Sequence, residues 1–170
     1  LLRDSRVFHV GSLYLAQPTS ASAQRHAVTA AQAAGIMVSA DPNLRVHLWN
    51  DRDAMLAAGR EVIGQAGIVK ISDEELVMLT GIEDTEAAVR SLWHDTMQVV
   101  AVTRGPEGAE IFTAGDHVRA EGFKVETVDT IGCGDAFMAT MLAELVGRDF
   151  RLSGRDELAA VARRACAAGA

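Results

Sequence analysis

The sequence predicts an α/β fold: a mostly parallel, doubly wound sheet with helices on both faces and an antiparallel edge. Three observations lead to this expectation. A strand, a helix and a strand follow one another at residues 6–10, 20–34 and 36–40, which is the spacing of a βαβ unit with a right-handed crossover. Residues 98–103 form a near-continuous apolar run, as central parallel strands do. Residues 117–127 alternate in polarity instead, which indicates half-exposed antiparallel strands at a sheet edge.

The remaining elements follow in order along the chain. Gly35 occupies the usual position after the first helix. Asp84 is the expected N-cap of a later helix, and Pro106 and Gly108 fix the turn of a β-hairpin. We expect further helices at residues 51–65, 84–95 and 156–168, a helix that starts at Asp135 and ends at Gly147, and further strands at residues 67–71 and 109–113.

Length, composition and charge limit the class of protein. The 170 residues are enough for one domain with a sizeable core, and 49% of them are hydrophobic. The net charge of −7, without a basic cluster, argues against nucleic acid as a partner. We expect no membrane-spanning segment, because no run of about 18 apolar residues is present, and residues 1–4 do not match a signal peptide. The first residue is not Met, so we expect the chain to be a piece of a longer protein.

Cysteine and histidine residues show no metal-binding pattern. Cys133 and Cys166 lie far apart without ligand spacing, and we expect both to be free thiols in a reducing cytoplasm. The five histidines form no cluster and are interpreted as surface or packing residues.

A polar loop, Asp41-Pro-Asn-Leu-Arg-Val-His-Leu-Trp49, follows the carboxyl end of the second strand. Ligands of open α/β sheets bind at this edge. One interpretation is a plain turn, because Asp-Pro and Asn are common turn residues. The other is that Asn43 and Arg45 face a phosphate or an acidic substrate.

The segment Asp129-Thr-Ile-Gly-Cys-Gly-Asp135 leads into an apolar helix. Its glycines let the backbone approach a ligand, and the unpaired N–H groups and dipole of a helix N-terminus suit a phosphate. Asp135 has two interpretations: an N-terminal cap, or a carboxylate that takes a proton from an attacking hydroxyl. The helix has one broad apolar face, formed by residues 137, 138, 141, 142, 145 and 146, and its methionines are interpreted as core residues.

This heptapeptide resembles the C-terminal signature of the ribokinase-like (PfkB) carbohydrate kinases, D-T-x-G-A-G-D, with Cys133 in place of the commoner Ala. The resemblance implies that the backbone of Gly132, Cys133 and Gly134 forms the anion hole for the transferred phosphoryl group. It also implies that Asp135 is the catalytic base.

Two upstream segments resemble the same family. D-P-N-x-R-x-x-L-W is similar to a segment of fructokinases and 2-keto-3-deoxygluconate kinases, which implies that Asn43 and Arg45 contact the substrate. The family carries K-x-N-x-x-E where Lys70 and Glu75 match and Ser72 replaces Asn. The match implies that Lys70 binds the nucleotide and that Glu75 helps to place magnesium and phosphate through water. Ser72 and Glu75 also have the spacing of a capping box, which is a structural reason for both.

Two further segments bear on the nucleotide. V-T-x-G-x-x-G resembles the family's nucleotide-binding turn, which implies that Thr103, Gly105 and Gly108 lie against ATP. The last helix resembles the family's adenine-side helix, with Cys166 where Asn is frequent.

The resemblance implies that residues 1–170 are the nucleotide-binding and catalytic part of a ribokinase-like domain. The N-terminal sugar-binding and lid part and the C-terminal end of that domain are not expected in this chain. The implied activity is transfer of the γ-phosphoryl group of ATP to a sugar hydroxyl with Mg²⁺, and fructose is the preferred substrate. The expected partners are therefore a sugar and ATP, with no nucleic acid and no membrane, in the cytoplasm.

Several alternatives stay open at this point. A keto sugar acid such as 2-keto-3-deoxygluconate is the alternative substrate, because Arg45 could pair with a carboxylate. The chain could also be a non-catalytic remnant that binds nucleotide. K⁺ dependence is open, as is a homodimer formed through the lid. A dinucleotide-binding dehydrogenase is disfavoured, because no G-x-G-x-x-G follows the first strand.

Overall fold

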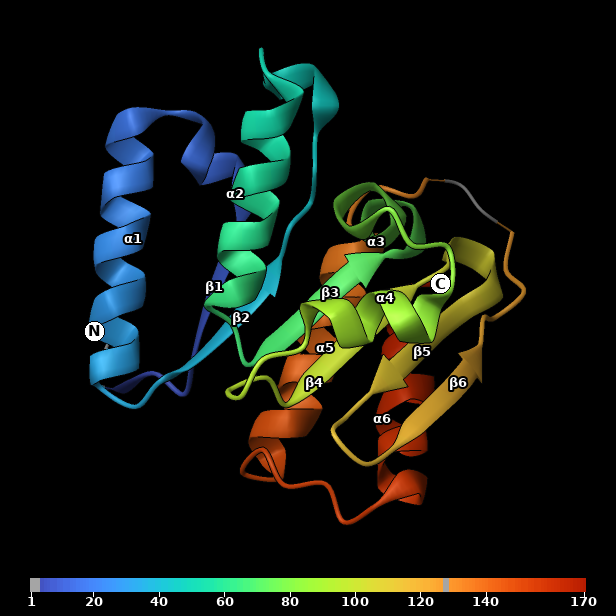
Figure 1. Ribbon diagram of the computed structural model, residues 1–170. Helices are drawn as coiled ribbons and strands as arrows, with labels where there is room; N and C mark the ends of the chain where they lie inside the picture. Colours follow the sequence, from blue (N-terminus) through green and yellow to red (C-terminus); the bar gives the residue numbers. More distant parts are fainter. Residues whose placement is uncertain (1–3, 127–128) are drawn as a thin grey trace. The chain divides into compact units, whose positions relative to one another are not determined.

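The computed structural model describes residues 4–126 and 129–170, and Figure 1 shows its elements in sequence colours. The chain divides into two compact units, Leu1–Val100 and Ala101–Ala170. Strand β4 (Val99–Thr103) begins in the first unit and ends in the second. The hydrogen-bonded strand order follows the sequence, from β1 to β4 in the first unit and from β4 to β6 in the second.

Parallel strands form the framework of the first unit. Strands β1 (Val7–Gly11) and β2 (Met37–Asp41) pair in parallel, and β2 pairs in parallel with β3 (Ile68–Ser72). Helix α1 (Pro18–Ala33) connects β1 to β2 after a 3₁₀ turn at Ser12–Ala16. The predicted βαβ unit is therefore confirmed.

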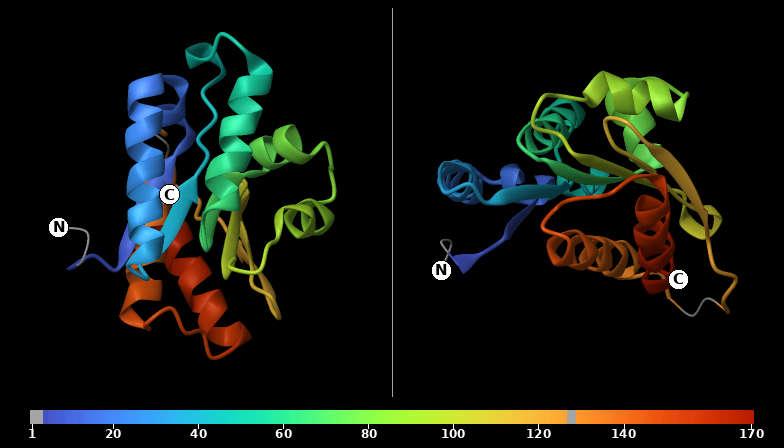
Figure 2. Two further views of the ribbon diagram at one scale, coloured as in Figure 1. Left: turned by 60° about the vertical axis from the view of Figure 1, so that its left-hand side comes forward. Right: turned by 90° about the horizontal axis from the view of Figure 1, so that it is seen from below.

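Three more helices belong to the first unit: α2 (Arg52–Gly64), α3 (Asp73–Thr80) and α4 (Thr85–Leu92). Helices α1 and α2 lie side by side (Figure 2), joined by an ion pair between Arg25 Nε and Glu61 Oε1 at 2.7 Å. Asp84 caps α4, as predicted. This helix ends at Leu92, before the predicted residue 95, because Trp93 already has extended backbone geometry.

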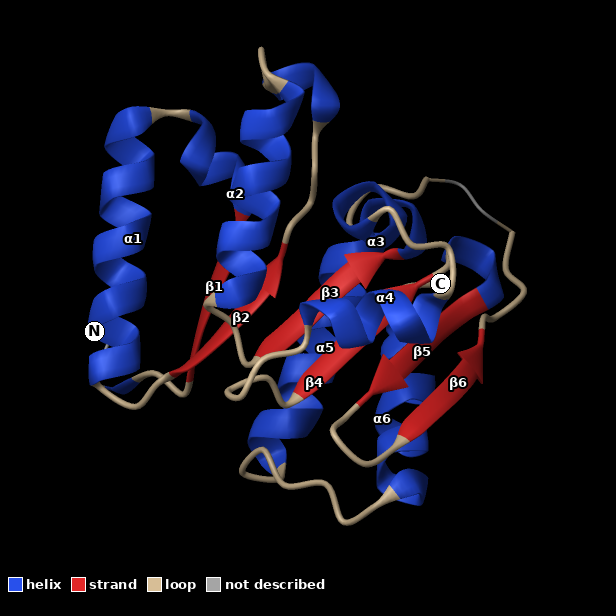
Figure 3. Cartoon of the chain, viewed as in Figure 1, coloured by secondary structure: helices blue, strands red, loops and turns tan. Residues whose placement is uncertain are grey.

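The second unit carries the antiparallel edge. Strands β5 (Gly108–Phe112) and β6 (His117–Glu121) pair antiparallel, and β6 alternates between exposed and buried residues as predicted. Helices α5 (Cys133–Gly147) and α6 (Arg155–Ala168) pack against each other, and α6 also packs on β5 and β6 (Figure 3). The mixed, mostly parallel sheet with an antiparallel edge is thus confirmed.

One predicted strand, at residues 123–127, was wrong for the part that the structure describes. Residues 122–126 have no regular secondary structure, and residue 127 lies outside the described residues. Strand β6 ends at Glu121. At Gly122 the backbone lies so close to the Pro106 carbonyl that a Cβ would overlap it, so this position requires glycine.

The core of each unit consists of aliphatic side chains from strands and helices. In the first unit Met55, Ile68 and Leu76 are among the largest fully buried residues. On α5 the predicted apolar face is buried at its centre and half-buried at residues 142 and 146. Met138 and Met141 are part of that buried core, as expected. Among the described residues, no helix has both the length and the apolar character needed to cross a membrane.

Candidate active site

Helix α5 begins at a glycine rather than at a capping side chain. Gly132 is the N-cap with a φ of 85°, a left-handed conformation that favours glycine, and no side chain caps the first turn. The Cys133 N–H donates to the Thr130 carbonyl at 3.3 Å. Among the described residues, the N–H groups of Gly134 and Asp135 have no acceptor. Two backbone donors at the positive end of the helix are thus available to an anion.

Asp135 occupies the third position of α5 and is exposed. Because Gly132 is the N-cap, the interpretation of Asp135 as the cap is wrong. Its negative charge in the first turn is still favourable for the helix dipole. An exposed carboxylate in the same helical turn as two unpaired N–H groups can accept a proton beside a bound anion, so Asp135 stays a candidate base.

The turn between β4 and β5 depends on two glycines with positive φ. Thr103 ends β4, and residues Gly105–Glu107 form a single 3₁₀ turn. Gly105 has a φ of 51° and Gly108 a φ of 100°. The Arg104 N–H closes the turn on the Gly108 carbonyl at 2.8 Å. The glycines of the predicted nucleotide turn are therefore needed by the backbone itself, as the hairpin interpretation expects.

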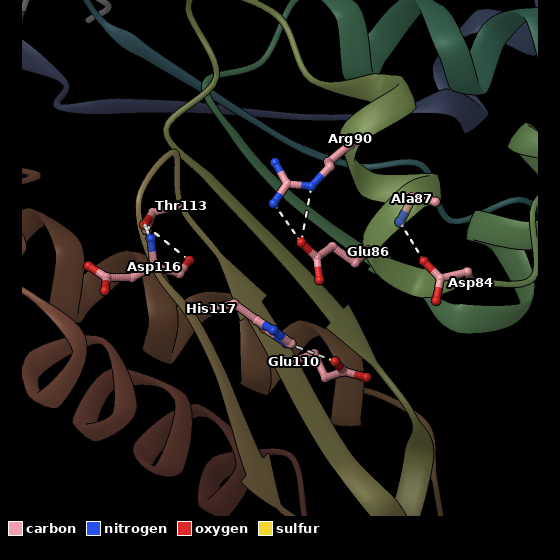
Figure 4. Close-up of polar contacts among 8 residues, drawn as sticks. All are labelled: Asp84, Glu86, Ala87, Arg90, Glu110, Thr113, Asp116 and His117. Carbon is pink, nitrogen blue, oxygen red and sulfur yellow. Dashed lines mark hydrogen bonds and ion pairs between the residues drawn. The ribbon is translucent and has the colours of Figure 1, made fainter.

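Side chains outside the predicted motif support this turn. Glu110 on β5 accepts from Arg104 Nε at 2.9 Å and pairs with His117 Nε2 at 2.8 Å, as Figure 4 shows for His117. The His117 ring stacks on Phe112 with centroids 4.1 Å apart. Sequence reasoning did not single out Glu110; the alternation of β5 and β6 was the only signal that could have placed it beside His117.

Cys166 lies on α6 and is buried against β6. Its Sγ is 4.0 Å from the Ala120 carbonyl oxygen, and burial raises the pKa of its thiol. The end of α6 also reaches the start of α5, because a Cβ at Gly169 would come within 2.9 Å of the Cys133 carbonyl oxygen. The adenine contact of Cys166 stays a prediction.

In the first unit, the loop after β2 carries the two predicted substrate residues. Asn43 is half-buried with a left-handed φ of 46°. Leu44 points into the core at 9% exposure, and Arg45 is exposed. The buried Leu44 side chain holds the loop against the core. The exposed Arg45 guanidinium remains available to solvent or to a ligand.

Glu75 connects this loop to helix α3. The predicted capping box is present: the Glu75 N–H donates to Ser72 Oγ at 3.2 Å, and the Ser72 N–H donates to Glu75 Oε2 at 3.1 Å. The second carboxylate oxygen, Oε1, accepts the Leu44 N–H at 2.6 Å. Sequence reasoning identified the box but missed the bond to the loop.

Lys70 forms a buried ion pair. Its Nζ lies 2.8 Å from Asp41 Oδ2, and the two side chains are 11% and 8% exposed. Burial raises the pKa of the Asp41 carboxyl, and the Lys70 ammonium opposes that shift. Lys70 was predicted to bind the nucleotide, whereas the contact that the structure shows is with Asp41.

Metal ligands are sparse in the described part of the chain. No group of three or more His, Cys, Asp or Glu side chains there is arranged to hold a metal ion. Glu75 already accepts hydrogen bonds on both oxygens. These bonds are compatible with a magnesium ion held through water, since Mg²⁺ commonly keeps water and phosphate ligands. Cys133 and Cys166 are both free, as predicted.

The predicted site residues are distributed over both units. The first unit contributes the loop residues and the β3–α3 pair, namely Asn43, Arg45, Lys70 and Glu75. The second contributes the glycine turn, the start of α5 and α6, namely Thr103, Gly105, Gly108, Gly132, Cys133, Gly134, Asp135 and Cys166.

A family model and curated relatives match the whole chain. The model of the pfkB family carbohydrate kinases matches residues 1–170. The chain therefore belongs to the pfkB family of carbohydrate kinases. It is 38% identical over 171 residues to fructokinase-2 of Zea mays, a match that covers 100% of this chain and 51% of that protein. The chain thus spans about half the length of the curated relatives it matches.

Solved structures show the same fold. The fructokinase from Vibrio cholerae O395, in its fructose, ADP and calcium ion bound form, aligns with a TM-score of 0.83 at 30% identity, over 97% of this chain and 53% of that one. The fructokinase with bound ATP from Xylella fastidiosa aligns with a TM-score of 0.87 at 26% identity, over 99% and 55%. The predicted ribokinase-like fold is confirmed.

Proposed function

We propose that the complete protein is an ATP-dependent sugar kinase that transfers the γ-phosphoryl group to a sugar hydroxyl, with fructose as the substrate. The observation that carries this proposal is the start of α5, where two unpaired backbone N–H groups lie beside the exposed carboxylate of Asp135. Membership of the pfkB family and similarity to fructokinases support it.

The chemistry needs little beyond positioning and stabilisation of charge. The N–H groups of Gly134 and Asp135 would donate to the phosphoryl oxygens as negative charge develops on them. Gly132 turns the chain so that these donors point outward, and Cys133 contributes a donor only if its 3.3 Å bond to Thr130 gives way. The Asp135 carboxylate would accept the proton of the attacking hydroxyl.

The nucleotide would lie against the β4–β5 turn, with Thr103, Gly105 and Gly108 as its backbone contacts and Cys166 on the adenine side. Magnesium would be held through water near Glu75, where it neutralises phosphate charge. Lys70 is the predicted nucleotide contact whose charge is already paired. Dimerisation, K⁺ dependence and a cytoplasmic location stay predictions.

Asn43 and Arg45 are the proposed substrate residues. The exposed Arg45 could bind the carboxylate of a keto sugar acid as a bidentate partner, which is why 2-keto-3-deoxygluconate is the alternative substrate. A panel of both sugars with the complete gene product distinguishes the two, because the true substrate is the one with the higher kcat/KM.

The catalytic assignment is tested with Asp135→Asn in the complete gene product. We expect kcat to fall roughly 10²–10⁴-fold, because the amide cannot accept the proton. The affinity for ATP, measured by calorimetric titration, should stay nearly unchanged. Asp156→Asn is the matched control, because it makes the same change in the first turn of α6.

Near-full turnover by Asp135→Asn would remove the base assignment. A wild-type protein that binds ATP but phosphorylates no sugar would favour the alternative of a non-catalytic nucleotide-binding protein.

A further inference from the structure

Neighbouring elements hold the backbone of residues 41–45 from two sides. The Ser12 N–H and Oγ both donate to the Pro42 carbonyl, at 3.2 and 2.5 Å. From the other side, Glu75 Oε1 accepts the Leu44 N–H at 2.6 Å. The loop therefore leaves the end of β2 with its backbone polar groups fixed on both sides of Asn43.

The ion pair between Asp41 and Lys70 fixes the first residue of this loop. It joins the last residue of β2 to β3, and both side chains are about nine-tenths buried. A buried ion pair is weak evidence for stability, because apolar replacement of both partners is often neutral or stabilising. The pair is better explained by the geometry it imposes than by the free energy it contributes.

Unsatisfied polar atoms point to the same segment. Among the described residues, the buried side-chain atoms without a hydrogen-bond partner are Asp41 Oδ1 and Trp49 Nε1. Both belong to the loop segment 41–49, at its two ends. Buried polar groups are nearly always paired, so two exceptions in one segment indicate a part of the molecule arranged for function.

We propose that the Asp41–Lys70 ion pair is a positioning device for the substrate loop. It holds the start of residues 41–45 so that, together with the bond between Glu75 and Leu44, it sets where Asn43 and Arg45 meet the sugar. Lys70 is then a positioning residue that acts through Asp41 instead of a contact to the nucleotide. This inference rests on the proposed function.

The test is the double variant Asp41→Asn/Lys70→Met in the complete gene product. It removes both charges at similar volume, so no unpaired buried charge is left. The first measurement is hydrogen exchange of the Leu44 amide, which the bond to Glu75 protects. Release of the loop should accelerate this exchange by roughly tenfold or more.

The second measurement compares KM for the sugar with KM for ATP. A displaced loop should raise KM for the sugar by roughly tenfold, because small misplacements of a positioning group are costly. KM for ATP should stay within about twofold of the wild-type value. Lys70→Arg keeps a cation beside Asp41 and should recover most of the sugar affinity.

The matched control is Arg25→Gln/Glu61→Gln. This variant removes another ion pair of the first unit, between α1 and α2, whose side chains are 55% and 28% exposed. Neither the exchange of Leu44 nor either KM should change.

Unchanged Leu44 exchange in the double variant would overturn the proposal, as would a raised KM for ATP with an unchanged KM for the sugar. If the double variant does not fold, the apolar pair Asp41→Leu/Lys70→Met, which also leaves no unpaired buried charge, is measured, and the same outcomes apply. If the wild-type protein phosphorylates no sugar, the proposed function fails; the exchange result then decides by itself whether the ion pair holds the loop.

Discussion

Gly108 shows how one residue determines the geometry of the predicted nucleotide turn. Its φ of 100° and ψ of −134° form a backbone conformation that residues with a side chain rarely adopt. A Cβ at this position would overlap the Ala120 carbonyl oxygen and the Gly122 amide nitrogen. These atoms are backbone atoms of β6 and of the residue just after it, so they cannot move aside as the end of a flexible side chain could.

We therefore expect Gly108→Ala to lower the free energy of unfolding by roughly 2–4 kcal/mol, from backbone strain and overlap together. Urea unfolding measures this change. Gly115→Ala is the control, because a Cβ at Gly115 would have no atom within 4 Å and the residue lacks a positive φ. Its effect should stay within about 0.5 kcal/mol. Equal stability of the two variants would contradict this account of the turn.

The contact between helices α5 and α6 contains a charged link at Glu144. Its carboxylate accepts from Arg164 Nε on α6 at 2.7 Å and from Arg148 Nη1 on its own helix at 2.5 Å. The hydrogen bond from Arg164 and, to a smaller extent, that from Arg148 lower the pKa of Glu144 from its ordinary value of 4.5. The link therefore depends on the ionised form of the carboxylate.

The direction of the pH effect follows from that shift. Because the folded pKa lies below the unfolded one, the contribution of Glu144 is complete above about pH 4.5 and is lost as the pH falls through the folded pKa. We expect the wild-type Tm to fall more steeply than that of Glu144→Gln between about pH 5 and 3.

Glu86→Gln is the control for this measurement. It alters the exposed Glu86–Arg90 pair of α4, which Figure 4 shows, and such pairs contribute little. Parallel Tm curves for the wild type and Glu144→Gln would contradict the role of the link.

At the scale of the whole molecule, local signals predicted most of the fold. Hydrophobic periodicity placed the strands and helices, and the Ser72–Glu75 capping box and the Asp84 cap depend on neighbours three residues away. Local signals failed after β6, where the alternating polarity predicted a strand that the described residues 122–126 do not form.

The candidate site was predicted as a set of residues but not as a set of contacts. The bonds from Glu75 to Leu44 and from Lys70 to Asp41 span 31 and 29 positions along the chain, so neither periodicity nor motif spacing reveals them. They exist because parallel pairing brings the ends of β2 and β3 to one edge. Motif resemblance identifies Lys70 and Glu75 as site residues, whereas only the fold shows that they contact Asp41 and Leu44.

Stabilisation by bound Mg·ATP tests whether the complete protein binds nucleotide. A ligand that binds only the folded state stabilises it by about 2.7 kcal/mol when its concentration is a hundredfold above Kd. Mg·ATP should therefore raise the Tm of the complete gene product progressively with concentration. Gly134→Val should remove most of this increase, because its side chain would project beside the N–H groups that are proposed to receive the phosphate.

Gly64→Val is the matched control for this titration. It makes the same substitution in the last turn of α2, where a Cβ has no atom within 4 Å, so the ATP-dependent rise in Tm should persist. If Mg·ATP raises the Tm of Gly134→Val as much as that of the wild type, the phosphate does not bind at the start of α5. No rise in the wild type, with calorimetric titration also silent, would contradict nucleotide binding itself, and the role of Asp135 would fall with it.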